Sequence, residues 1–274
     1  MTLHLDPRRI AMLQEMGLRL LPRAAERPPT PEVEAAAAAA LEAAAAPAIH
    51  ERPQRPQAPA PAEAPVLAPA ALAPRIAGDR PAGVEALDWA ALEAAVAGCR
   101  ACGLCESRRN TVFGVGPQRA DWMVIGEAPG ENEDAQGEPF VGQAGKLLDN
   151  MLRAAGLDRR RNVYIANVLK CRPPGNRNPQ PQEVAQCEPF LRRQVALVQP
   201  RMILAMGRFA VQTLLQSQEP VGRLRGRVHR YQGVPVVVTY HPAYLLRNLQ
   251  DKAKAWADLC LAMDLMDGGS ADTP

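Results

Sequence analysis

The stretch that decides the fold is Trp122-Met123-Val124-Ile125-Gly126, followed directly by the turn sequence Glu127-Ala128-Pro129-Gly130. A short, partly β-branched apolar run that ends at such a turn is typical of a strand buried on both faces of a sheet. Further runs of this kind lie at residues 163–167, 202–207 and 234–240. Helical patterns alternate with them, at residues 145–155, 181–198, 208–216 and 252–266. This alternation predicts an α/β fold of three layers, α/β/α, with a central four-stranded parallel sheet.

The carboxyl ends of the predicted strands carry polar side chains, and in open parallel sheets ligands bind outside these ends. Glu127 supplies a carboxylate that can activate a water molecule. Asn167 supplies an amide that both donates and accepts, and can therefore read the edge of a base. His241 can donate to an oxygen on which negative charge develops. Taken singly, these residues also fit an ordinary acidic turn and a structural histidine.

Composition divides the chain into a short amphipathic helix, a disordered Ala/Pro-rich linker, one folded domain and a disordered tail, at residues 1–23, 24–84, 85–266 and 267–274. The linker carries 23 Ala and 12 Pro, whereas all 11 aromatic residues lie between Trp89 and Trp256. A helix as short as the first is marginal in water by itself. We therefore expect its apolar face to dock on the domain or on a protein partner.

Charge is segregated along the chain although the formal net charge is only +3. Residues 153–230 contain 15 Lys and Arg against four acidic residues. Such a concentration favours a polyanionic partner, with solvated helix faces as the alternative. No apolar run approaches the ~20 residues that span a bilayer, and the first 23 residues lack the features of a signal peptide. We expect a cytoplasmic protein without a membrane partner.

Four of the six cysteines have the spacing of a metal site, with two close together and two on a later segment: Cys99, Cys102, Cys171 and Cys187. Four thiolates from two segments suit either Zn²⁺ or a [4Fe–4S] cluster, and their spacing does not separate these. Cys105 imitates the third member of a ferredoxin run, but position 109, where the fourth would stand, is Arg. We interpret Cys105 as a spare and Cys260 as a core residue. Unrelated buried thiols are the alternative for the other four.

Several dispersed motifs occur in one order along the domain: CRAC (99–102), VFGVG (112–116), GEAPGENED (126–134), GEPFVGQAG (137–145), VYIANVLKCRPPGNRNP (163–179), the later Cys187 and HPAYLLR (241–247). Together they closely resemble family 4 uracil-DNA glycosylases, the iron–sulfur branch of the uracil-DNA glycosylase superfamily. The resemblance runs from about Cys99 to Met266 and includes none of the first 85 residues. It implies a uracil-DNA glycosylase-like fold, a catalytic domain at 85–266, and a [4Fe–4S] cluster rather than zinc, held by Cys99, Cys102, Cys171 and Cys187.

The resemblance also implies roles in catalysis. His241, with N–H groups near Glu127 and Ala128, would stabilise the uracil anion as it leaves. Glu127 is the first candidate for orienting the attacking water. Glu133 is the second candidate, and it would also crowd the methyl group of thymine.

Substrate recognition is implied for a second set of residues. Phe140 would stack on the base, Asn167 would bond to its pyrimidine edge, and Asn176 would support the water or a phosphate. Contacts to DNA would come from Arg172, Arg177, Tyr244, Leu246 and Arg247. The same family pattern does not decide which of these side chains fills the space left by the flipped base.

The function implied is a monofunctional glycosylase that flips uracil out of DNA, hydrolyses its N-glycosidic bond and so initiates base excision repair. The partner would be uracil-containing DNA, single- or double-stranded, and the enzyme a monomer. A catalytically silent iron–sulfur module that binds nucleic acid is the alternative, and an electron carrier a third. Strand cleavage through a Schiff base on Lys170 is disfavoured, since this residue lies beside Cys171, where its charge can balance that of a cluster.

Overall fold

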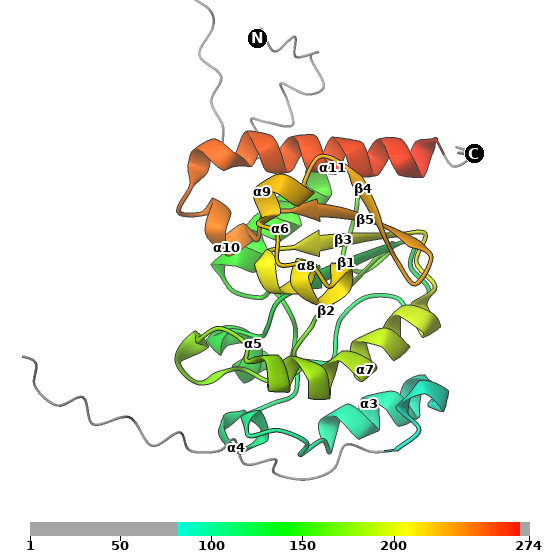
Figure 1. The fold of residues 1–274 in the computed structure, drawn as a ribbon, viewed down its shortest axis with the longest axis vertical. Coiled ribbons are helices and arrows are strands. Elements are labelled where there is room, and N and C mark those ends of the chain that lie inside the picture. Colours follow the sequence, from blue (N-terminus) through cyan, green and yellow to red (C-terminus); the bar gives the residue numbers. More distant parts are fainter. Residues whose placement is uncertain (1–81, 269–274) are drawn as a thin grey trace, which may run out of the picture. The chain divides into compact units, whose positions relative to one another are not determined.

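The computed structural model describes residues 82–268, in which helices and strands alternate as expected (Figure 1). The strands are β1 (Trp122–Gly126), β2 (Val163–Asn167), β3 (Met202–Met206), β4 (Val228–Tyr231) and β5 (Val234–Thr239). The longer helices are α3 (Trp89–Ala97), α6 (Gln143–Ala154), α7 (Pro181–Val198), α8 (Arg208–Leu215) and α11 (Lys252–Asp267). Short helices are α4 (Leu104–Ser107), α5 (Glu131–Gln136), α9 (Val221–Leu224) and α10 (Pro242–Leu245). Single 3-10 turns are η1 (Val84–Ala86), η2 (Pro174–Asn176) and η3 (Leu249–Asp251).

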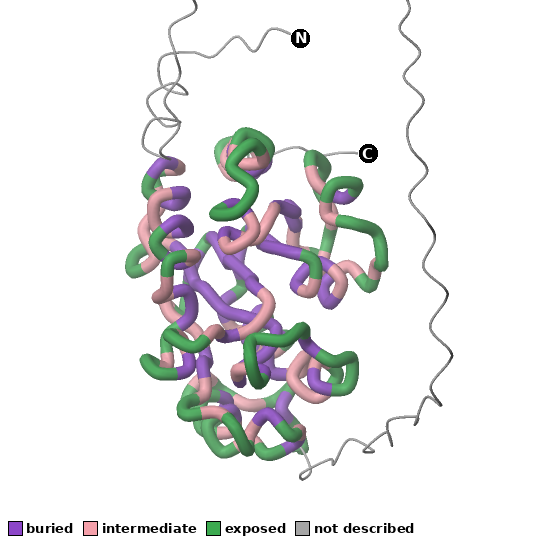
Figure 2. The backbone as a smooth tube through the Cα atoms, turned by 90° about the vertical axis from the view of Figure 1, so that its left-hand side faces the viewer, coloured by how far each residue is buried: buried purple, intermediate pink, exposed green. Residues whose placement is uncertain are grey.

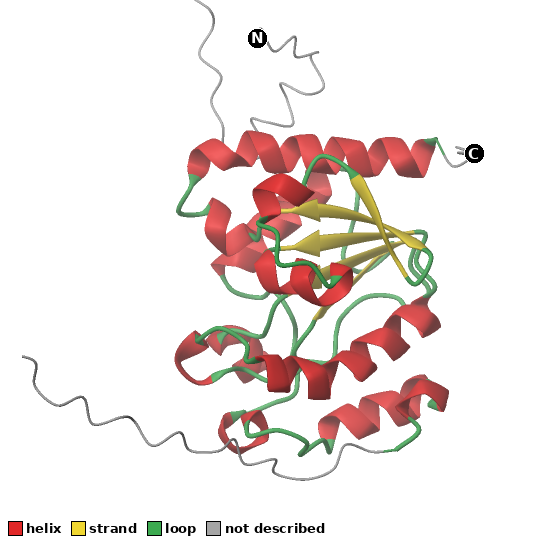
Figure 3. Cartoon of the chain, viewed as in Figure 1, coloured by secondary structure: helices red, strands yellow, loops and turns green. Residues whose placement is uncertain are grey.

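The sheet has the strand order β2-β1-β3-β5-β4, in which the first four strands are parallel. These are the four predicted strands, so the α/β class and the parallel sheet are confirmed. The count of four was wrong, because β4 pairs antiparallel with β5 at the edge (Figure 3). β4 is short, and its side chains alternate between exposed and half-buried, so it lacks the apolar run of a central strand. The tight turn at Gln232 and Gly233, both with positive φ, closes the hairpin.

Helices cover both faces of the sheet, which makes the three layers. Along β1, Trp122 and Val124 pack on one side with α6 and α11, whereas Met123 and Ile125 pack on the other with α7 and α8. Figure 1 shows α11 and α7 on opposite sides of the sheet, and Figure 2 shows the buried backbone running between them. A third cluster joins α3 to α7 and includes Val84. The sheet therefore forms the buried centre of the domain, and loops lie at the carboxyl ends of its parallel strands.

The expected helix at 181–198 is confirmed at both ends. Pro181 occupies the first turn, where no backbone N–H is needed, and the Glu183 carboxylate accepts from the N–H of Gln180 at 2.9 Å. The predicted amphipathic helix at 1–23, most of the predicted linker at 24–84 and residues 269–274 of the predicted tail lie outside the described residues. Within residues 82–268, no helix combines the length and the apolar character needed to cross a bilayer.

Candidate active site

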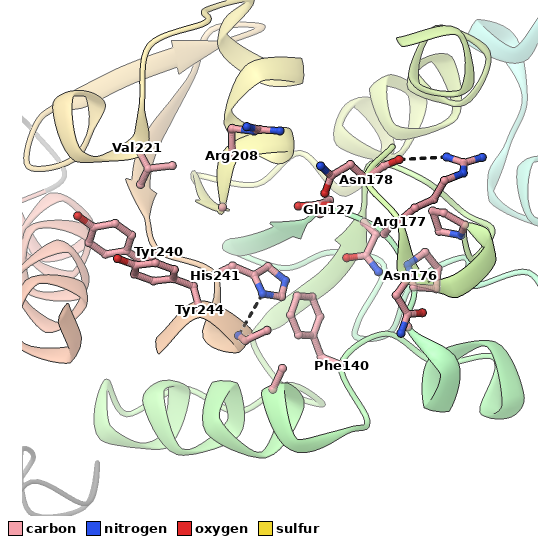
Figure 4. Close-up of a pocket in the computed structure, with 18 of the residues that line it drawn as sticks. Glu127, Phe140, Asn176, Arg177, Asn178, Arg208, Val221, Tyr240, His241 and Tyr244 are labelled. Atoms are coloured by element: carbon pink, nitrogen blue, oxygen red, sulfur yellow. Dashed lines mark hydrogen bonds between the residues drawn. The ribbon is translucent and has the colours of Figure 1, made fainter. Parts of the chain in front are cut away.

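A pocket of about 690 Å³ lies at the carboxyl edge of the sheet (Figure 4). It brings together most of the residues proposed from sequence for catalysis, base binding and DNA contact: Glu127, Ala128, Glu133, Phe140, Asn167, Asn176, Arg177, Tyr244, Arg247 and His241. Two predicted DNA-contacting residues, Arg172 and Leu246, do not line it. Segments that are far apart in sequence therefore converge at the strand ends, as the parallel sheet requires.

Asn167 is buried at the end of β2, directly beside the end of β1. In the parallel ladder Gly126 pairs with Asn167. Asn167 is only 2% exposed, and its Oδ1 has no hydrogen-bond partner among the described residues. A Cβ atom at Gly126 would lie 2.4 Å from this Oδ1 and 2.5 Å from Cζ of Phe140. The absence of a side chain at Gly126 therefore makes room for the Asn167 amide and the Phe140 ring. Oδ1 of Asn167 remains free to accept a hydrogen bond.

Phe140 forms a second wall of the pocket and is held in an unusual conformation. Its backbone has φ 55°, in the left-handed region that bulky residues rarely adopt. The side chain is buried, and its ring centroid lies 5.5 Å from that of His241 with the planes tilted by 30°. Figure 4 shows the two rings side by side. The ring is thus fixed next to both the open amide and the imidazole.

His241 is a neutral imidazole whose proton position follows from one hydrogen bond. The N–H of Ala243, in α10, donates to Nδ1 of His241 at 3.1 Å. Burial, with the nearby charge of Arg247, lowers the pKa of His241 to about 4. Because Nδ1 accepts, the single proton of the neutral ring sits on Nε2. Gly207 makes room for this ring, since a Cβ there would lie 3.0 Å from Cβ of His241.

Glu127 follows β1 immediately and lines the same pocket. Burial raises the pKa of its carboxyl to about 7, and the positive charge of Arg208 opposes that rise. A carboxyl with a pKa near neutrality is suited to exchange protons with a water molecule or to orient it. Arg208 begins α8, and its guanidinium lies over the ring of Phe209 at 4.4 Å from the centroid.

Glu133 occupies a different position from that expected of a water-activating residue. One carboxylate oxygen accepts from the N–H groups of Val141 and Gly142, at 2.9 and 3.0 Å. The other accepts from the N–H of Gly130 at 3.1 Å and caps α5. Three backbone donors bind the carboxylate, which favours a role in holding the loop after Phe140 over a role in proton transfer.

The predicted DNA-contacting residues lie around the mouth of the pocket. Arg177 makes a paired contact with the nearly buried carboxylate of Glu183. Arg172 donates through Nε to Oδ1 of Asn176 at 2.8 Å, and its Nη2 lies 3.6 Å from a Glu131 oxygen. These two arginines are therefore already engaged with neighbouring side chains.

On the opposite side of the mouth, Tyr244 stacks on Tyr240 with ring centroids 5.1 Å apart. The hydroxyl of Tyr244 donates to Asp251 at 2.7 Å, which holds the ring in place. Leu246 is 43% exposed and Leu249 is 58% exposed, two of the few large apolar side chains that face solvent in residues 82–268. Exposed apolar side chains beside a pocket are suited to insertion between bases.

Some lining residues were not foreseen, among them Arg208, Asn178, Tyr240 and Val221. The carboxyl end of the predicted strand at 202–207 was expected, like the other strand ends, to lie near a ligand, but Arg208, which follows it, was assigned no role. Its place, directly after the third strand end, was the available signal. No such signal exists for Asn178, because its loop carries no strand or helix pattern that fixes where the side chain lies. Val221 begins the four-residue helix α9, which is too short to give a helical pattern in the sequence.

Five cysteines line a second, smaller pocket on the side of the sheet where α7 packs: Cys99, Cys102, Cys105, Cys171 and Cys187. No disulfide joins them. In residues 82–268, no group of three His, Cys, Asp or Glu side chains is arranged to hold one metal ion. The donor chemistry nevertheless suits a thiolate-bound cluster, since Arg108 Nη1 donates to Sγ of Cys171 at 3.1 Å and the N–H of Lys170 donates to Sγ of Cys187 at 3.3 Å.

Lys170 is buried and directed away from the active-site pocket. Its Nζ donates to the carbonyl of Asn167 at 2.8 Å and to Oε1 of Gln194 at 2.6 Å. Gln194 in turn donates to the hydroxyl of Tyr164 at 3.0 Å and to the carbonyl of Phe113 at 2.9 Å. Lys170 therefore supports the main chain that carries Asn167, and its amine does not face the pocket.

The comparisons with known proteins agree with this geometry. The family model of the uracil DNA glycosylase superfamily matches residues 113–260. A type-4 uracil-DNA glycosylase of Archaeoglobus fulgidus is 44% identical over 175 residues, which cover 61% of this chain and 86% of that protein. Type-4 enzymes of Saccharolobus solfataricus and Sulfurisphaera tokodaii are 43% and 42% identical, and the matches cover 55% and 56% of this chain and 73% of each relative. These matches confirm the resemblance, and the chain belongs to the uracil DNA glycosylase superfamily.

Proposed function

We propose that this protein is a uracil-DNA glycosylase of the type-4 branch that flips uracil out of DNA and hydrolyses its N-glycosidic bond, the first step of base excision repair. The single observation that carries the proposal is the buried, unpartnered Oδ1 of Asn167 beside the ring of Phe140. A buried acceptor without a partner costs about 1–3 kcal/mol, so it calls for a ligand that donates. The relatives named above are called uracil-DNA glycosylases.

Uracil has the edge that Asn167 requires. Its N3–H can donate to the open Oδ1, and its O4 can accept from the amide nitrogen of the same side chain. Cytosine has an acceptor at N3 and a donor in place of O4, so both contacts would become mismatches of about 1–3 kcal/mol each. The ring of Phe140 would stack on the flipped pyrimidine, since face-to-face contact of this kind is available to any base. Recognition therefore separates into stacking by Phe140 and discrimination by Asn167.

Departure of the base places negative charge on uracil, and His241 is the group that stabilises this charge. The neutral imidazole donates through Nε2–H to a uracil oxygen without having to give up a proton. Such a donor, fixed before the reaction begins, stabilises the transition state by about 2.7–4 kcal/mol where this has been measured for oxyanions. The hydrogen bond from Ala243 keeps the ring in the required tautomer.

Glu127 would orient the water that attacks the sugar carbon. Because its pKa lies near 7, a large share of the molecules carry the carboxylate at neutral pH. The carboxylate accepts a hydrogen bond from the water and draws it toward the sugar, on which positive charge develops as the bond breaks. Arg208, which lines the same pocket, favours this ionised form.

DNA would be held around the mouth of the pocket. Tyr244, Leu246 and Arg247 lie on one side, and the loop with Arg172 and Arg177 lies on the other. A base inside a duplex cannot reach the floor of the pocket, so the nucleotide must be extruded. Leu246, exposed beside the pocket, is suited to fill the vacated space.

A [4Fe–4S] cluster held by Cys99, Cys102, Cys171 and Cys187 fits the donor set of the second pocket. When bound, the cluster would crosslink the segment before β1 to the segment after β2, a structural rather than a redox contribution. The guanidinium of Arg108 already donates to Cys171, which suits the negative charge of a thiolate-bound cluster. The basic loop that follows Cys171 would thereby be fixed near DNA phosphate.

The proposal is tested with a uracil-containing oligonucleotide, treated with alkali after incubation to cleave abasic sites. We expect excision by the wild-type protein and losses of at least a hundredfold for Asn167→Ala and His241→Ala, the scale measured for removal of one donor at an oxyanion. Asn150→Ala is the matched control and should excise normally, because the Asn150 side chain only accepts an exposed hydrogen bond from Arg153 within α6. DNA binding without excision by the wild-type protein would instead support the silent module.

A further inference from the structure

The loop that carries Phe140 is hydrogen-bonded by Arg159, which lies outside the pocket and has no role predicted from the sequence. Arg159 lies in the connection between α6 and β2, 19 residues after Phe140. Its Nη2 donates to the carbonyl of Pro139 at 2.8 Å and its Nη1 to the carbonyl of Phe140 at 3.2 Å. Arg159 does not line the active-site pocket, so it cannot touch a bound base.

The guanidinium of Arg159 also forms an ion pair with a carboxylate, although the two atoms that approach each other make no hydrogen bond. Nε of Arg159 lies 3.4 Å from Oδ1 of Asp149, which belongs to α6, and the arginine side chain is 19% exposed. A planar guanidinium that faces a carboxylate on one edge and two carbonyls on the other has little freedom to rotate. Asp149 and Arg159 therefore form a clamp, defined as these two side chains, between α6 and the Phe140 loop.

The clamp holds the backbone of Phe140, which has an unfavourable conformation. A non-glycine residue in the left-handed region costs about 1–2 kcal/mol, and Phe140 has φ 55°. Glu133 binds the N–H groups that follow Phe140, at Val141 and Gly142. Arg159 binds the carbonyls at and before it, so both sides of the strained residue are fixed by a buried or half-buried charge.

Helix α6 closes the remaining side of the Phe140 backbone. A Cβ at Gly145 would lie 1.9 Å from the carbonyl oxygen of Phe140, so the helix and the loop are in direct contact. The ring of Phe140 packs against Gly126 and next to Asn167. A shift of the loop carbonyls would therefore move the ring relative to the amide that reads the base.

We infer that Arg159 is a positioning residue, which with Asp149 holds the ring of Phe140 in register with Asn167 for stacking on the flipped base. The inference rests on the proposed function, because it assigns Phe140 the stacking role. Its consequence is specific: removing Arg159 should impair the chemical step through Phe140 alone, while DNA binding outside the pocket is retained. A misplacement of about 1 Å in such a site can cost on the order of a hundredfold in rate.

The test compares single-turnover excision of uracil by the wild type, Arg159→Ala, Arg159→Lys and the control Arg160→Ala. Arg160 is the exposed neighbour, and its replacement removes the same charge without touching the loop. We expect a rate loss of about tenfold to a hundredfold for Arg159→Ala, partial recovery for Arg159→Lys, no loss for Arg160→Ala, and unchanged affinity for abasic DNA in all four.

A double variant separates positioning from a merely structural role. In the Phe140→Ala background, Arg159→Ala should cause no further loss of rate, because the ring that it positions is gone. An undiminished loss in that background, or an equal loss for Arg160→Ala, would overturn the inference. If Arg159→Ala fails to fold, Asp149→Asn tests the same clamp, since it removes the ion pair with the guanidinium and keeps the size of the side chain. A wild-type protein without excision refutes the proposed function itself, which is a different outcome.

Discussion

Ala243 donates its backbone N–H to Nδ1 of His241, and this one bond fixes the tautomer of the neutral imidazole that faces the pocket. Burial and the nearby charge of Arg247 lower the pKa of His241 to about 4. The ring therefore stays neutral throughout the physiological range. It can donate through Nε2 without titrating.

The pH dependence of excision should follow Glu127 and not His241. The pKa of Glu127 is about 7, so the carboxylate needed to orient water is lost as the pH falls through that value. At one pH unit below, about a tenth of the molecules retain it, and the rate should fall by about tenfold. Single-turnover rates of the wild type and Glu127→Gln, measured at constant ionic strength, check this. If the rate of Glu127→Gln still falls at acidic pH in the same way, the ionisation belongs to another group.

The same carboxyl should reduce stability at neutral and alkaline pH. Its pKa is raised on folding from 4.5 to about 7, so the folded state holds its proton more tightly than the unfolded state. Stability contributed by the protonated form is present below pH 4.5 and is lost as the pH rises through about 7. We expect Glu127→Gln to raise stability at pH 8 by about 1 kcal/mol, discounted for partial exposure, and to change it little at pH 4. Denaturant unfolding at the two pH values measures the difference.

Much of the scaffold follows from the sequence, because each central strand is an apolar run and a polar residue ends each run or follows it within two residues. The positions of Glu127, Asn167 and His241 at one edge follow from parallel pairing alone. The β4 hairpin could not be predicted in this way, since an edge strand with alternating exposure resembles a loop. The contacts of Arg159 could not be predicted either, because its partners are the backbone carbonyls of residues 139 and 140, which do not depend on side-chain type.

Gly126 should be intolerant of even one methyl group. A Cβ there would lie within 2.6 Å of both Asn167 Oδ1 and Phe140 Cζ, so Gly126→Ala must displace the amide or the ring. We expect loss of uracil excision by at least tenfold, with the sheet retained. Gly98→Ala is the matched control, since a Cβ at that position would meet only the Ala94 carbonyl, at 3.5 Å. Normal excision by Gly126→Ala would show that the space between ring and amide is not the base site.

Lys170 should form no Schiff base with an abasic site. Its Nζ is bonded to Asn167 and Gln194 inside the protein and does not reach the pocket. Borohydride reduction during turnover should therefore trap no covalent complex with DNA, and the product strand should remain uncut until alkali is added. Lys170→Met should lower stability, because it leaves the buried Asn167 carbonyl and the Gln194 amide oxygen without their donor. A trapped complex that disappears in Lys170→Met would show that the lysine moves and reacts.

The cysteines should differ sharply in their effect on iron binding. We expect Cys171→Ala to lose iron, sulfide and the visible absorption of a cluster, because it removes one of four ligands and the partner of Arg108. Cys105→Ala is the closest control: it lies in the same pocket but outside the proposed ligand set, and it should retain all three. Purification without exposure to air, followed by iron and sulfide determination, measures both. Equal loss of iron in the two variants would show that Cys105 is also a ligand. Zinc without sulfide in the wild-type protein would show that the cysteines bind a single metal ion and not a cluster.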